Sequence, residues 1–366
     1  MRSLANLCDW AADRYAIRVL TRNRDLGEQQ PYQGCGTGTW HSQDGITVGY
    51  VSESFRAPGL IRRAVREAAP DLLYFQSFLD PLTTVLPLTM RRLGLLPVSI
   101  PAVVAPRGEL SPGALALKAR KKNVYLRLAR WFGLYRGVAW HATSDAEAGH
   151  IRRWAGADAR VFLAPNLPRR AAIGAGAGRR DKRPGQLRLA FLSRVSRMKN
   201  LDGAIAMLAA AGVPVEFDIY GMLEDAPYWE HCQAAIRALP RQVTVRYCGV
   251  VPPADVPAVL DRYHAFFLPT LGENFGHVIL EALLAGCPVL ISDRTPWRGL
   301  EARRAGFDID LENPDGFAAA LRRLADMDAA QYTVWSDGAR HAGLAYSAQA
   351  DVAVPTFAML AALTGD

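Results

Sequence analysis

The stretch from Leu271 to Arg298, which reads LGENFGHVILEALLAGCPVLISDRTPWR, constrains the fold of this chain more than any other. Its middle, His277 to Ala285, reads as a short apolar helix, which Gly286 is placed to end before an apolar strand begins at Pro288. The run that precedes it, His264 to Thr270, is short and apolar enough to be a buried strand. A strand, a turn, a helix and a second strand in this order predict a parallel α/β sheet.

This stretch contains two glutamates, one before the turn and one on the helix. Ligands of open α/β sheets bind beyond the carboxyl ends of the strands, and a helix N-terminus there attracts anions because its first N–H groups are unpaired. We therefore expect Glu273 at the mouth of a ligand site, with Glu281 two turns along the helix. The alternative is an ordinary strand–helix–strand unit that contains two glutamates by chance.

The same alternation of apolar runs and helical patterns fills the first half of the 366 residues, a length sufficient for two domains. It predicts a parallel sheet covered on both faces. The expected helices are Leu4–Asp13, Pro58–Ala69 and Pro81–Leu93. The expected strands are Ala16–Thr21, Asp44–Ser52, Asp71–Phe75 and Ile100–Ala105. The glycine-rich GCGTGTW, at Gly34–Trp40, follows no apolar strand and precedes no helix, so we expect a loop there and not a dinucleotide-binding motif.

Residues 169–186, RRAAIGAGAGRRDKRPGQ, show no periodicity and read as a linker. A strong strand follows at Leu187–Ser193, and Arg194 and Lys199 stand between it and a helix at Leu201–Ala211. Two cations at the carboxyl end of a strand can neutralise a diphosphate and the charge that it takes up as a leaving group. Two further strands are expected at Val215–Tyr220 and Val243–Gly249, and two helices at Pro227–Ala238 and Asn313–Met327. A last helix is expected at Gln349–Leu363, which Pro355 should kink or delay.

Charge is distributed unevenly along the chain. Through Lys182 there are 27 Lys and Arg against 14 Asp and Glu, whereas the remainder has 16 against 21. A basic first half indicates an anionic partner, such as lipid headgroups, a polyprenyl diphosphate or nucleic acid. The alternative is a basic face that is merely solvated.

One basic segment, Lys118–Arg136, has helical spacing of its apolar residues Val124, Leu128, Trp131 and Tyr135. Such a helix can lie on an anionic membrane, with the cations at the headgroups and the aromatic rings in the interface. The same pattern also fits a core helix with a solvated basic side, and the sequence leaves both readings open.

Several classes of site have no counterpart in the sequence. The five cysteines are scattered without a CxxC pair, which fits a reducing cytoplasm, and the seven histidines lack a metal-ligand spacing. The triplets Asp308–Asp310 and Asp326–Asp328 are interpreted as chance, so no metal site is expected. No apolar run approaches the roughly 18 residues of a membrane-spanning helix, and the N-terminus lacks the apolar segment of a secretory signal.

The order of residues from Glu273 to Val289 resembles the donor-site signature of retaining glycosyltransferases of family 4. Two glutamates are separated by seven residues, Phe-Gly follows the first, and Ala-x-x-x-Gly-x-Pro-Val follows the second. RVSRMKN, at 194–200, resembles the family's Gly-Arg-x-x-x-x-Lys-Gly, with Ser193 and Asn200 in place of the glycines. APRG at 105–108, HATSDAEAGHI at 141–151 and APN at 164–166 also resemble the family.

The resemblance implies roles for particular residues. Glu273 would contact hydroxyls of the donor sugar, Glu281 would hold the nucleotide ribose, and Gly221 and Val251 would lie near the base. Arg194, Lys199 and Glu273 are the implied catalytic residues. The whole implied donor site is Arg194, Lys199, Gly221, Val251, Glu273, Asn274, Phe275, Gly276 and Glu281. Some members of the family carry a histidine where this chain has Arg107, so the role of that histidine does not carry over. Arg107 becomes a candidate for the sugar or acceptor site.

The resemblance also implies the GT-B architecture, in which two Rossmann-like domains face each other across a cleft and a C-terminal helix crosses back to the first. The expected boundaries are 1–168 for an acceptor domain, 169–186 for the linker, 187–345 for a nucleotide-sugar domain and 346–366 for the crossing helix. The usual first strand of the acceptor domain, with its Gly-rich loop near the donor diphosphate, has no counterpart in residues 1–4. Either the start is truncated or the protein works without that loop.

The expected function is a retaining, metal-independent transfer of a hexose from a UDP- or GDP-sugar, without a further cofactor. The acceptor would be a saccharide or a polyprenyl-diphosphate-linked saccharide of envelope or exopolysaccharide assembly, reached from the cytoplasm at the inner membrane face. The alternative is a non-catalytic or truncated protein that binds sugar nucleotides. A nucleic-acid-binding protein is disfavoured because no recognised motif or aromatic stacking stripe is present. An NAD-dependent oxidoreductase is disfavoured because no properly placed G-x-G-x-x-G is found.

Overall fold

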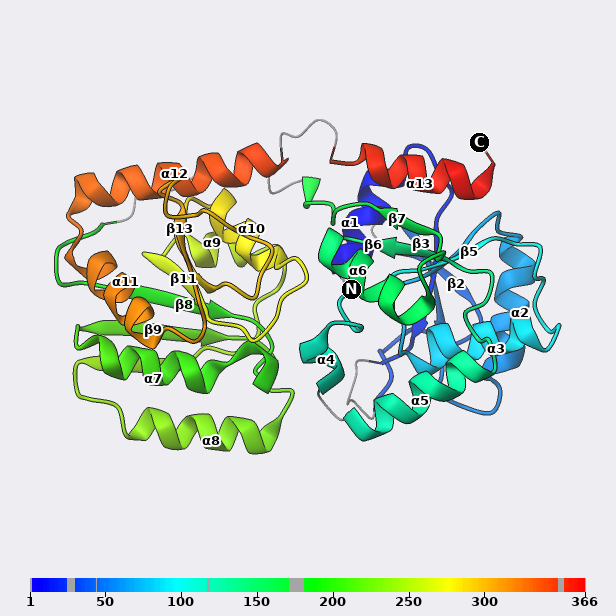
Figure 1. Cartoon of the computed structure of the whole chain (residues 1–366), viewed down its shortest axis with the longest axis horizontal. Helices are drawn as coiled ribbons and strands as arrows, with labels where there is room; N and C mark the ends of the chain where they lie inside the picture. The colour runs from blue at the N-terminus through cyan, green and yellow to red at the C-terminus, as the bar shows by residue number, and fades with distance from the viewer. Residues whose placement is uncertain are drawn as a thin grey trace. The chain divides into compact units, whose positions relative to one another are not determined.

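The computed structural model describes residues 2–24, 30–43, 45–116, 119–170, 181–347 and 352–365 of the chain. The chain forms two compact units (Figure 1). The first comprises Met1–Leu167 together with Asp351–Asp366, and the second comprises Pro168–Ala350. Both units are α/β, as the alternation in the sequence predicts.

The second unit is built on one sheet of six strands, all parallel to their neighbours. The order across the sheet is β10-β9-β8-β11-β12-β13. The strands are β8 (Arg188–Leu192), β9 (Val215–Tyr220), β10 (Val243–Tyr247), β11 (Ala265–Leu268), β12 (Val289–Ser292) and β13 (Gly306–Ile309). The chain builds outward from β8 in one direction and then from β11 in the other, so the strand order reverses between these two strands. Ligand sites of open α/β sheets lie at such a switch point.

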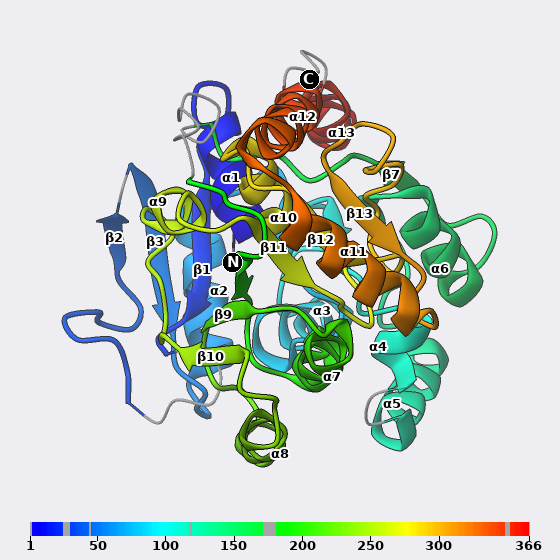
Figure 2. The same cartoon turned by 90° about the vertical axis from the view of Figure 1, so that its left-hand side faces the viewer.

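Helices cover both faces of this sheet. Contacts join α7 to α8 and α11, and join α10 to α9 and α12, and Figures 1 and 2 show these two groups on opposite sides of the strands. Strands covered on both sides are apolar throughout, and β11 and β12 are buried along their whole length. The bounds are α7 (Leu201–Ala211), α8 (Ala226–Arg237), α9 (Val256–Leu260), α10 (His277–Leu284), α11 (Pro314–Asp326) and α12 (Ala329–Ser347), with a short 3₁₀ turn at Arg197–Lys199.

Helix α12 is a long helix that the sequence interpretation missed. It contains Gly338 and Gly343, which weaken a helical pattern. In the structure these glycines allow close packing of backbones. A Cβ at 338 would lie 2.5 Å from the carbonyl oxygens of Arg303 and Arg304, and a Cβ at 343 would lie 2.8 Å from the backbone nitrogen of Leu284. Tertiary packing therefore sets this helix, and local propensity does not.

The first unit departs from the single parallel sheet that we expected. It has a parallel sheet in the order β4-β5-β6-β7 and a separate sheet in the order β1-β3-β2, in which β2 runs antiparallel to β3. The strands are β1 (Arg18–Arg22), β2 (Trp40–Gln43), β3 (Ile46–Val51), β4 (Leu73–Phe75), β5 (Ala102–Val104), β6 (Ala139–Ala142) and β7 (Val161–Leu163). The helices are α1 (Arg2–Ala11), α2 (Ala57–Ala68), α3 (Leu86–Arg92), α4 (Pro112–Ala116), α5 (Ala119–Trp131), α6 (Asp145–Ala155) and α13 (Val354–Thr364), with a π turn at Pro81–Val85.

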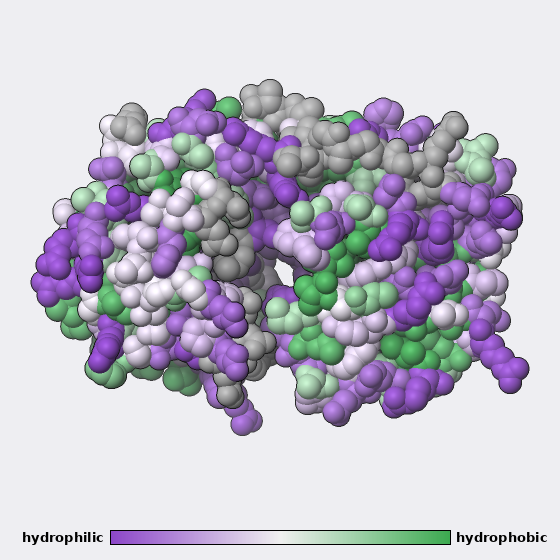
Figure 3. Space-filling model, turned by 180° about the vertical axis from the view of Figure 1, so that it is seen from behind, coloured by the Kyte–Doolittle hydropathy of each residue, from purple (hydrophilic) through white to green (hydrophobic). Residues whose placement is uncertain are grey.

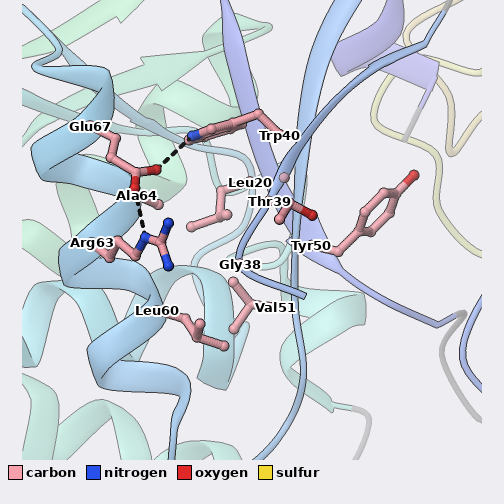
Figure 4. Close-up of a pocket in the computed structure, with 11 residues that line it drawn as sticks. Leu20, Gly38, Thr39, Trp40, Tyr50, Val51, Leu60, Arg63, Ala64 and Glu67 are labelled. Carbon is pink, nitrogen blue, oxygen red and sulfur yellow. Dashed lines mark hydrogen bonds and ion pairs between the residues drawn. The ribbon is translucent and has the colours of Figure 1, made fainter. Parts of the chain in front are cut away.

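The GCGTGTW segment forms the turns that lead into β2, as a loop was expected, and its last residue begins that strand. Trp40 Nε1 donates to Glu67 Oε2 on α2 at 3.2 Å, and the same carboxylate pairs with Arg63 Nε at 2.6 Å (Figure 4). Gly38 has φ +79°, and a Cβ there would lie 2.9 Å from a Leu60 methyl carbon. Gly38 therefore serves the packing of a small apolar hollow between this sheet and α2.

The last helix, α13, belongs to the first unit, which confirms that the chain crosses back. Its residues Met359, Leu360 and Leu363 form one buried cluster with Val103 and Ala139 of the parallel sheet. Pro355 lies in the first turn of α13, where its missing N–H costs nothing, so the proline delays the helix and does not kink it.

Hydrophilic residues cover most of the surface seen in Figure 3, and hydrophobic residues gather in separate patches. Within the described part of the chain, no helix is long and apolar enough to cross a membrane.

The packing of α13 makes a first prediction. We expect Met359→Ala to lower the free energy of unfolding by about 2–5 kcal/mol, because it removes a fully buried side chain from the α13 cluster. Val354→Ala in the same helix is the control, since Val354 is exposed and its loss should change stability by less than about 0.5 kcal/mol. Denaturant unfolding, with hydrogen exchange of β5 and β6, measures both. Equal effects of the two variants would contradict this placement of α13.

Candidate functional site

The switch point of the second unit holds an ion pair. Lys199 follows β8 and Glu273 follows β11, and Lys199 Nζ donates to Glu273 Oε2 at 2.5 Å. Their side chains are only 11% and 21% exposed, so the pair is shielded from solvent more than a surface salt bridge is. Two of the residues that the sequence singles out for chemistry, 74 positions apart, are thus brought into direct contact.

Hydrogen bonds fasten the loop after β8 to the loop after β11. The carbonyl oxygen of Met198 accepts from the Thr270 hydroxyl at 2.8 Å and from the Leu271 N–H at 2.9 Å. Asn200 Nδ2 donates to the Pro269 carbonyl at 2.8 Å, and Ser292, at the end of β12, donates to the Thr270 carbonyl at 2.6 Å. These bonds hold the two loops in one arrangement, which is what a preorganised site requires.

Asn200 shows how the chain does without a glycine at this position. Its φ is +56° and its ψ is +46°, a left-handed conformation that glycine adopts most easily and asparagine tolerates best among the others. The backbone thus keeps the glycine-like turn, and the side chain adds the bond to Pro269.

Ser193, which stands at the other position where the family has a glycine, lies directly against Gly221, the residue after β9. Gly221 has φ +141°, and a Cβ on it would lie 1.8 Å from the Ser193 carbonyl oxygen. Its N–H donates to the Gly249 carbonyl at 2.8 Å, and its own carbonyl accepts from the Tyr247 hydroxyl at 2.8 Å. Gly221 is therefore needed for close packing of the strand ends, and Val251 is half-buried in the turn that follows Gly249.

The turn before α10 presents backbone groups and buries its aromatic ring. Phe275 is buried, its ring packs on Trp297 and Tyr346, and its carbonyl accepts from Trp297 Nε1 at 2.6 Å. Gly276 has φ +78°, where a Cβ would lie 2.6 Å from Ile279. Among the described residues, no side chain caps the N-terminus of α10 at this glycine. This helix end carries the partial positive charge of the helix dipole, which favours anions.

Glu281 lies on the side of α10 that is turned away from the core. His277, Val278 and Glu281 are half-buried, whereas Ile279, Leu280 and the residues from Ala282 to Leu284 are buried. Asn274 is half-buried as well, and its N–H donates to Glu273 Oε1 at 3.2 Å. The structure thus places Glu273 in the loop and Glu281 on the following helix, as the sequence predicts.

Arg194 has a partner that the sequence interpretation missed. Its Nη1 lies 2.7 Å from both carboxylate oxygens of Glu224, which follows β9. Its Nε and Nη2 donate to none of the described residues, and the side chain is exposed, unlike that of Lys199. The signal that could have found Glu224 is its position after the strand adjacent to β8, because the carboxyl ends of neighbouring parallel strands meet at one edge.

Arg107 lies in the first unit, at the carboxyl end of β5, with φ +54°. Its guanidinium donates to Gln76 Oε1 at 2.8 and 3.0 Å, to Asn166 Oδ1 at 2.8 Å and to the Tyr74 hydroxyl at 3.2 Å. All of these acceptors are neutral, and no carboxylate among the described residues is paired with Arg107. Neutral acceptors therefore hold the Arg107 side chain in place, and the buried carboxylate of Glu147 accepts from the N–H of the next residue, Gly108, at 2.6 Å.

A buried histidine completes this cluster. His141 Nε2 lies 2.7 Å from the Ala164 carbonyl, which can only accept, so Nε2 carries the proton and Nδ1 accepts from the Tyr74 hydroxyl. Burial first, and the Arg107 charge second, lower the pKa of His141 from 6.5 to about 3. The imidazole is therefore neutral at physiological pH, and the bonds run from Arg107 through Tyr74 and His141 to Ala164.

In each of the two D-x-D triplets, at least one carboxylate accepts hydrogen bonds from backbone N–H groups of a turn or a helix start. Asp308 accepts from the N–H groups of Gly299 and Leu300, and Asp328 accepts from the N–H of Gln331 at the start of α12. Across the residues that the structure describes, no group of three or more His, Cys, Asp and Glu is arranged to hold a metal ion.

Two family models match the chain, one in each unit. The model described as "Glycosyl transferases group 1" matches residues 178–342, and that described as "Glycosyl transferase 4-like domain" matches residues 2–166. Together they account for most of the chain, which therefore belongs to the family 4 type of GT-B glycosyltransferases. Among curated relatives, "O-antigen chain mannosyltransferase B" of Escherichia coli is 29% identical over 165 residues, which are 43% of this chain and 41% of that protein.

Solved structures support the fold over nearly the whole chain. WaaG, described as a glycosyltransferase involved in lipopolysaccharide biosynthesis, has a TM-score of 0.68 at 16% identity and covers 100% of this chain and 96% of its own. HepE of Anabaena, in complex with UDP and glucose, has a TM-score of 0.64 at 18% identity, over 88% and 87% of the two chains. The matches to the first curated relatives span less than half of those proteins, 41% and 26%.

The buried histidine makes a prediction for pH. The unfolded chain takes up a proton on His141 as the pH falls below 6.5, and the folded chain does not until about pH 3. Above pH 6.5 His141 is neutral in both states and does not lower the free energy of unfolding. As the pH falls from about 7 to about 5, protonation of the unfolded chain lowers the free energy of unfolding by about 2 kcal/mol. His141→Gln, which keeps a donor and an acceptor, should abolish this part of the pH dependence in denaturant unfolding. An unchanged pH dependence in this variant would contradict the account.

Proposed function

We propose that the chain transfers a hexose from a nucleotide diphosphate sugar to a saccharide or lipid-linked saccharide, with retention of configuration and without a metal ion. The observation that carries the proposal is the Lys199–Glu273 pair between β8 and β11. A cation for the diphosphate and a carboxylate for the sugar meet at the switch point of a parallel sheet, where this architecture binds its ligands.

Leaving-group stabilisation would be the main catalytic contribution. Lys199 Nζ has three N–H donors and uses one on Glu273, so two remain for diphosphate oxygens. Arg194 would add its Nε and Nη2, and the N-terminus of α10 would add backbone N–H groups and its dipole. All of these act on the negative charge that develops as the bond from the sugar C1 to the diphosphate breaks, which is where stabilisation lowers the barrier.

Glu273 would orient the sugar by accepting bonds from its hydroxyls, so that the acceptor attacks from the side that the diphosphate leaves. Its position is held by Lys199, by the Asn274 N–H and by a bond from its own N–H to the Arg294 carbonyl at 2.9 Å. Glu281 would bind the ribose, and Gly221 and Val251 would border the base. In the first unit, Arg107 would bind an acceptor or sugar oxygen, since neutral acceptors hold its guanidinium in place.

The relatives favour a role in envelope glycan assembly. One is an O-antigen mannosyltransferase, one structural neighbour acts in lipopolysaccharide biosynthesis, and another was solved with UDP and glucose. We therefore propose a UDP- or GDP-hexose as donor and a saccharide or polyprenyl-diphosphate-linked acceptor. The proposed place of action is the cytoplasmic side of the plasma membrane.

Removing the cation tests the leaving-group role. We expect Lys199→Met to lower kcat by about 10²–10³, because it removes one preorganised donor from the developing charge. Arg323→Met is the control, since Arg323 is a cation of the same unit in a solvent-exposed ion pair with Glu301, at 2.6 Å, away from the switch point. Steady-state rates with UDP- and GDP-hexoses measure both variants. Near-normal turnover by Lys199→Met would contradict the role.

Removing the carboxylate tests the orientation of the sugar. Glu273→Gln keeps the shape and loses the charge, and we expect a fall in kcat of the same order, about 10²–10³. Glu301→Gln is the matched control at an exposed pair. The anomeric configuration of the product, read by NMR, tests retention in the unsubstituted enzyme. An inverted product, or near-normal turnover by Glu273→Ala, would overturn this part of the proposal.

Nucleotide binding separates the enzyme from its alternative, a protein that binds sugar nucleotides without turnover. A nucleoside diphosphate that binds only the folded chain should stabilise it by about 2.7 kcal/mol at a hundredfold excess over Kd. We expect such a shift with UDP or GDP, and a smaller one in Glu281→Ala. A shift without turnover of any hexose donor would favour the alternative, and no shift with either nucleotide would contradict both.

A further inference from the structure

Helix α5 of the first unit and the residue that follows it, Phe132, expose large apolar side chains to solvent. Val124, Leu128, Trp131 and Phe132 are 57%, 45%, 79% and 68% exposed. The opposite side of the helix is its packed side, where Ala129 is buried and Tyr125 and Leu126 pack against the core cluster. The interpretation of this segment as a core helix requires Val124, Leu128 and Trp131 to be buried. It is wrong for these residues, because all three are exposed to solvent.

Of the four apolar residues that the sequence analysis placed at helical spacing, only Tyr135 packs in the protein core. It is buried, and its hydroxyl donates to the Phe78 carbonyl at 2.5 Å. Its place on the outer face is taken by Phe132, whose ring lies 4.9 Å from that of Trp131. Lys118 of the predicted segment lies outside the described residues.

Cations flank the exposed apolar residues on the same helix. Arg120, Lys121, Arg127 and Arg130 are exposed, as is Arg136 in the turn that follows. None of these five side chains is in an ion pair with any residue that the structure describes. The sequence from Leu110 to Ser144 contains seven Lys and Arg and no Asp or Glu. This surface is thus positive, unpaired and apolar together.

A loop joined to the turn after α5 also exposes apolar side chains. Arg92, at the end of α3, donates to the Arg136 carbonyl at 2.6 Å and so ties the loop after α3 to the turn after α5. That loop exposes Leu93 and Val98, at 69% and 70%. Two segments joined by a hydrogen bond therefore both present large apolar side chains to solvent.

We propose that this face, made of Val124, Leu128, Trp131 and Phe132 with Arg120, Lys121, Arg127 and Arg130, docks the chain on an anionic lipid bilayer. Cations bind the headgroups of acidic lipids, and the apolar and indole side chains enter the interface beside them. A nucleic acid would use the cations but would leave the aliphatic side chains in water. A protein partner would need a complementary acidic and apolar surface. The combination of charge and exposed apolar residues fits the bilayer best.

Sedimentation of the full chain with lipid vesicles tests the proposal directly. We expect binding to vesicles that contain phosphatidylglycerol, little binding to phosphatidylcholine alone, and weakening at high salt. Arg127→Glu with Arg130→Glu should weaken binding by more than the roughly 30-fold expected for losing two surface cations. Trp131→Ala with Phe132→Ala should weaken binding at low salt and at high salt alike, because these side chains contribute through apolar contact and not through charge.

Two control variants keep the test specific. Phe55→Ala removes an aromatic residue of the same unit that is 89% exposed, and Arg62→Glu with Arg66→Glu makes the same charge change on α2. Both should bind vesicles as the unsubstituted chain does. Equal losses in the controls, binding independent of acidic lipid, or no binding to any vesicle would overturn the proposal. The measurement uses neither donor nor acceptor, so its outcome is independent of the proposed transfer activity.

Discussion

The contact between Lys199 and Glu273 depends on the reversal of strand order between β8 and β11. Only at that point do the chain segments leaving two adjacent parallel strands turn to opposite faces and leave space between their loops. The rest of the second unit serves this arrangement. Met198 and Asn200 fasten the two loops, Gly221 lets the strand ends approach, and Phe275 anchors the turn before α10 in the core.

The same arrangement explains why the charged groups are close without neutralising the site. Lys199 uses one donor on Glu273, and Arg194 uses one nitrogen on Glu224, so each cation is positioned by a carboxylate and retains N–H groups for an anion. If the site binds a diphosphate as proposed, it would need little rearrangement to do so. Preorganisation of this kind is the form of electrostatic catalysis that needs least rearrangement during the reaction.

Sequence reasoning found the parts of the molecule in which local pattern and tertiary structure agree. The run from His264 to Arg298 gave its strands, helix and carboxylates correctly, because turn residues and an apolar helix mark each boundary. Helix α12 was missed because Gly338 and Gly343 serve backbone contacts with Leu284 and the 303–304 turn, which no local pattern shows. The antiparallel strand β2 was missed because Trp40 is held by Glu67, far along the chain on α2. Glu224 was missed because its partner becomes a neighbour only through strand order.

The most direct test of the central claim is hydrogen–deuterium exchange of the full chain with and without UDP or GDP. The account predicts slower exchange on binding in two segments, residues 193–200 after β8 and residues 270–277 after β11. These segments contain the two halves of the switch-point pair, and a diphosphate held by both should protect both. Protection confined to the first unit, or to neither loop while nucleotide is bound, would contradict the placement of the donor site at this switch point.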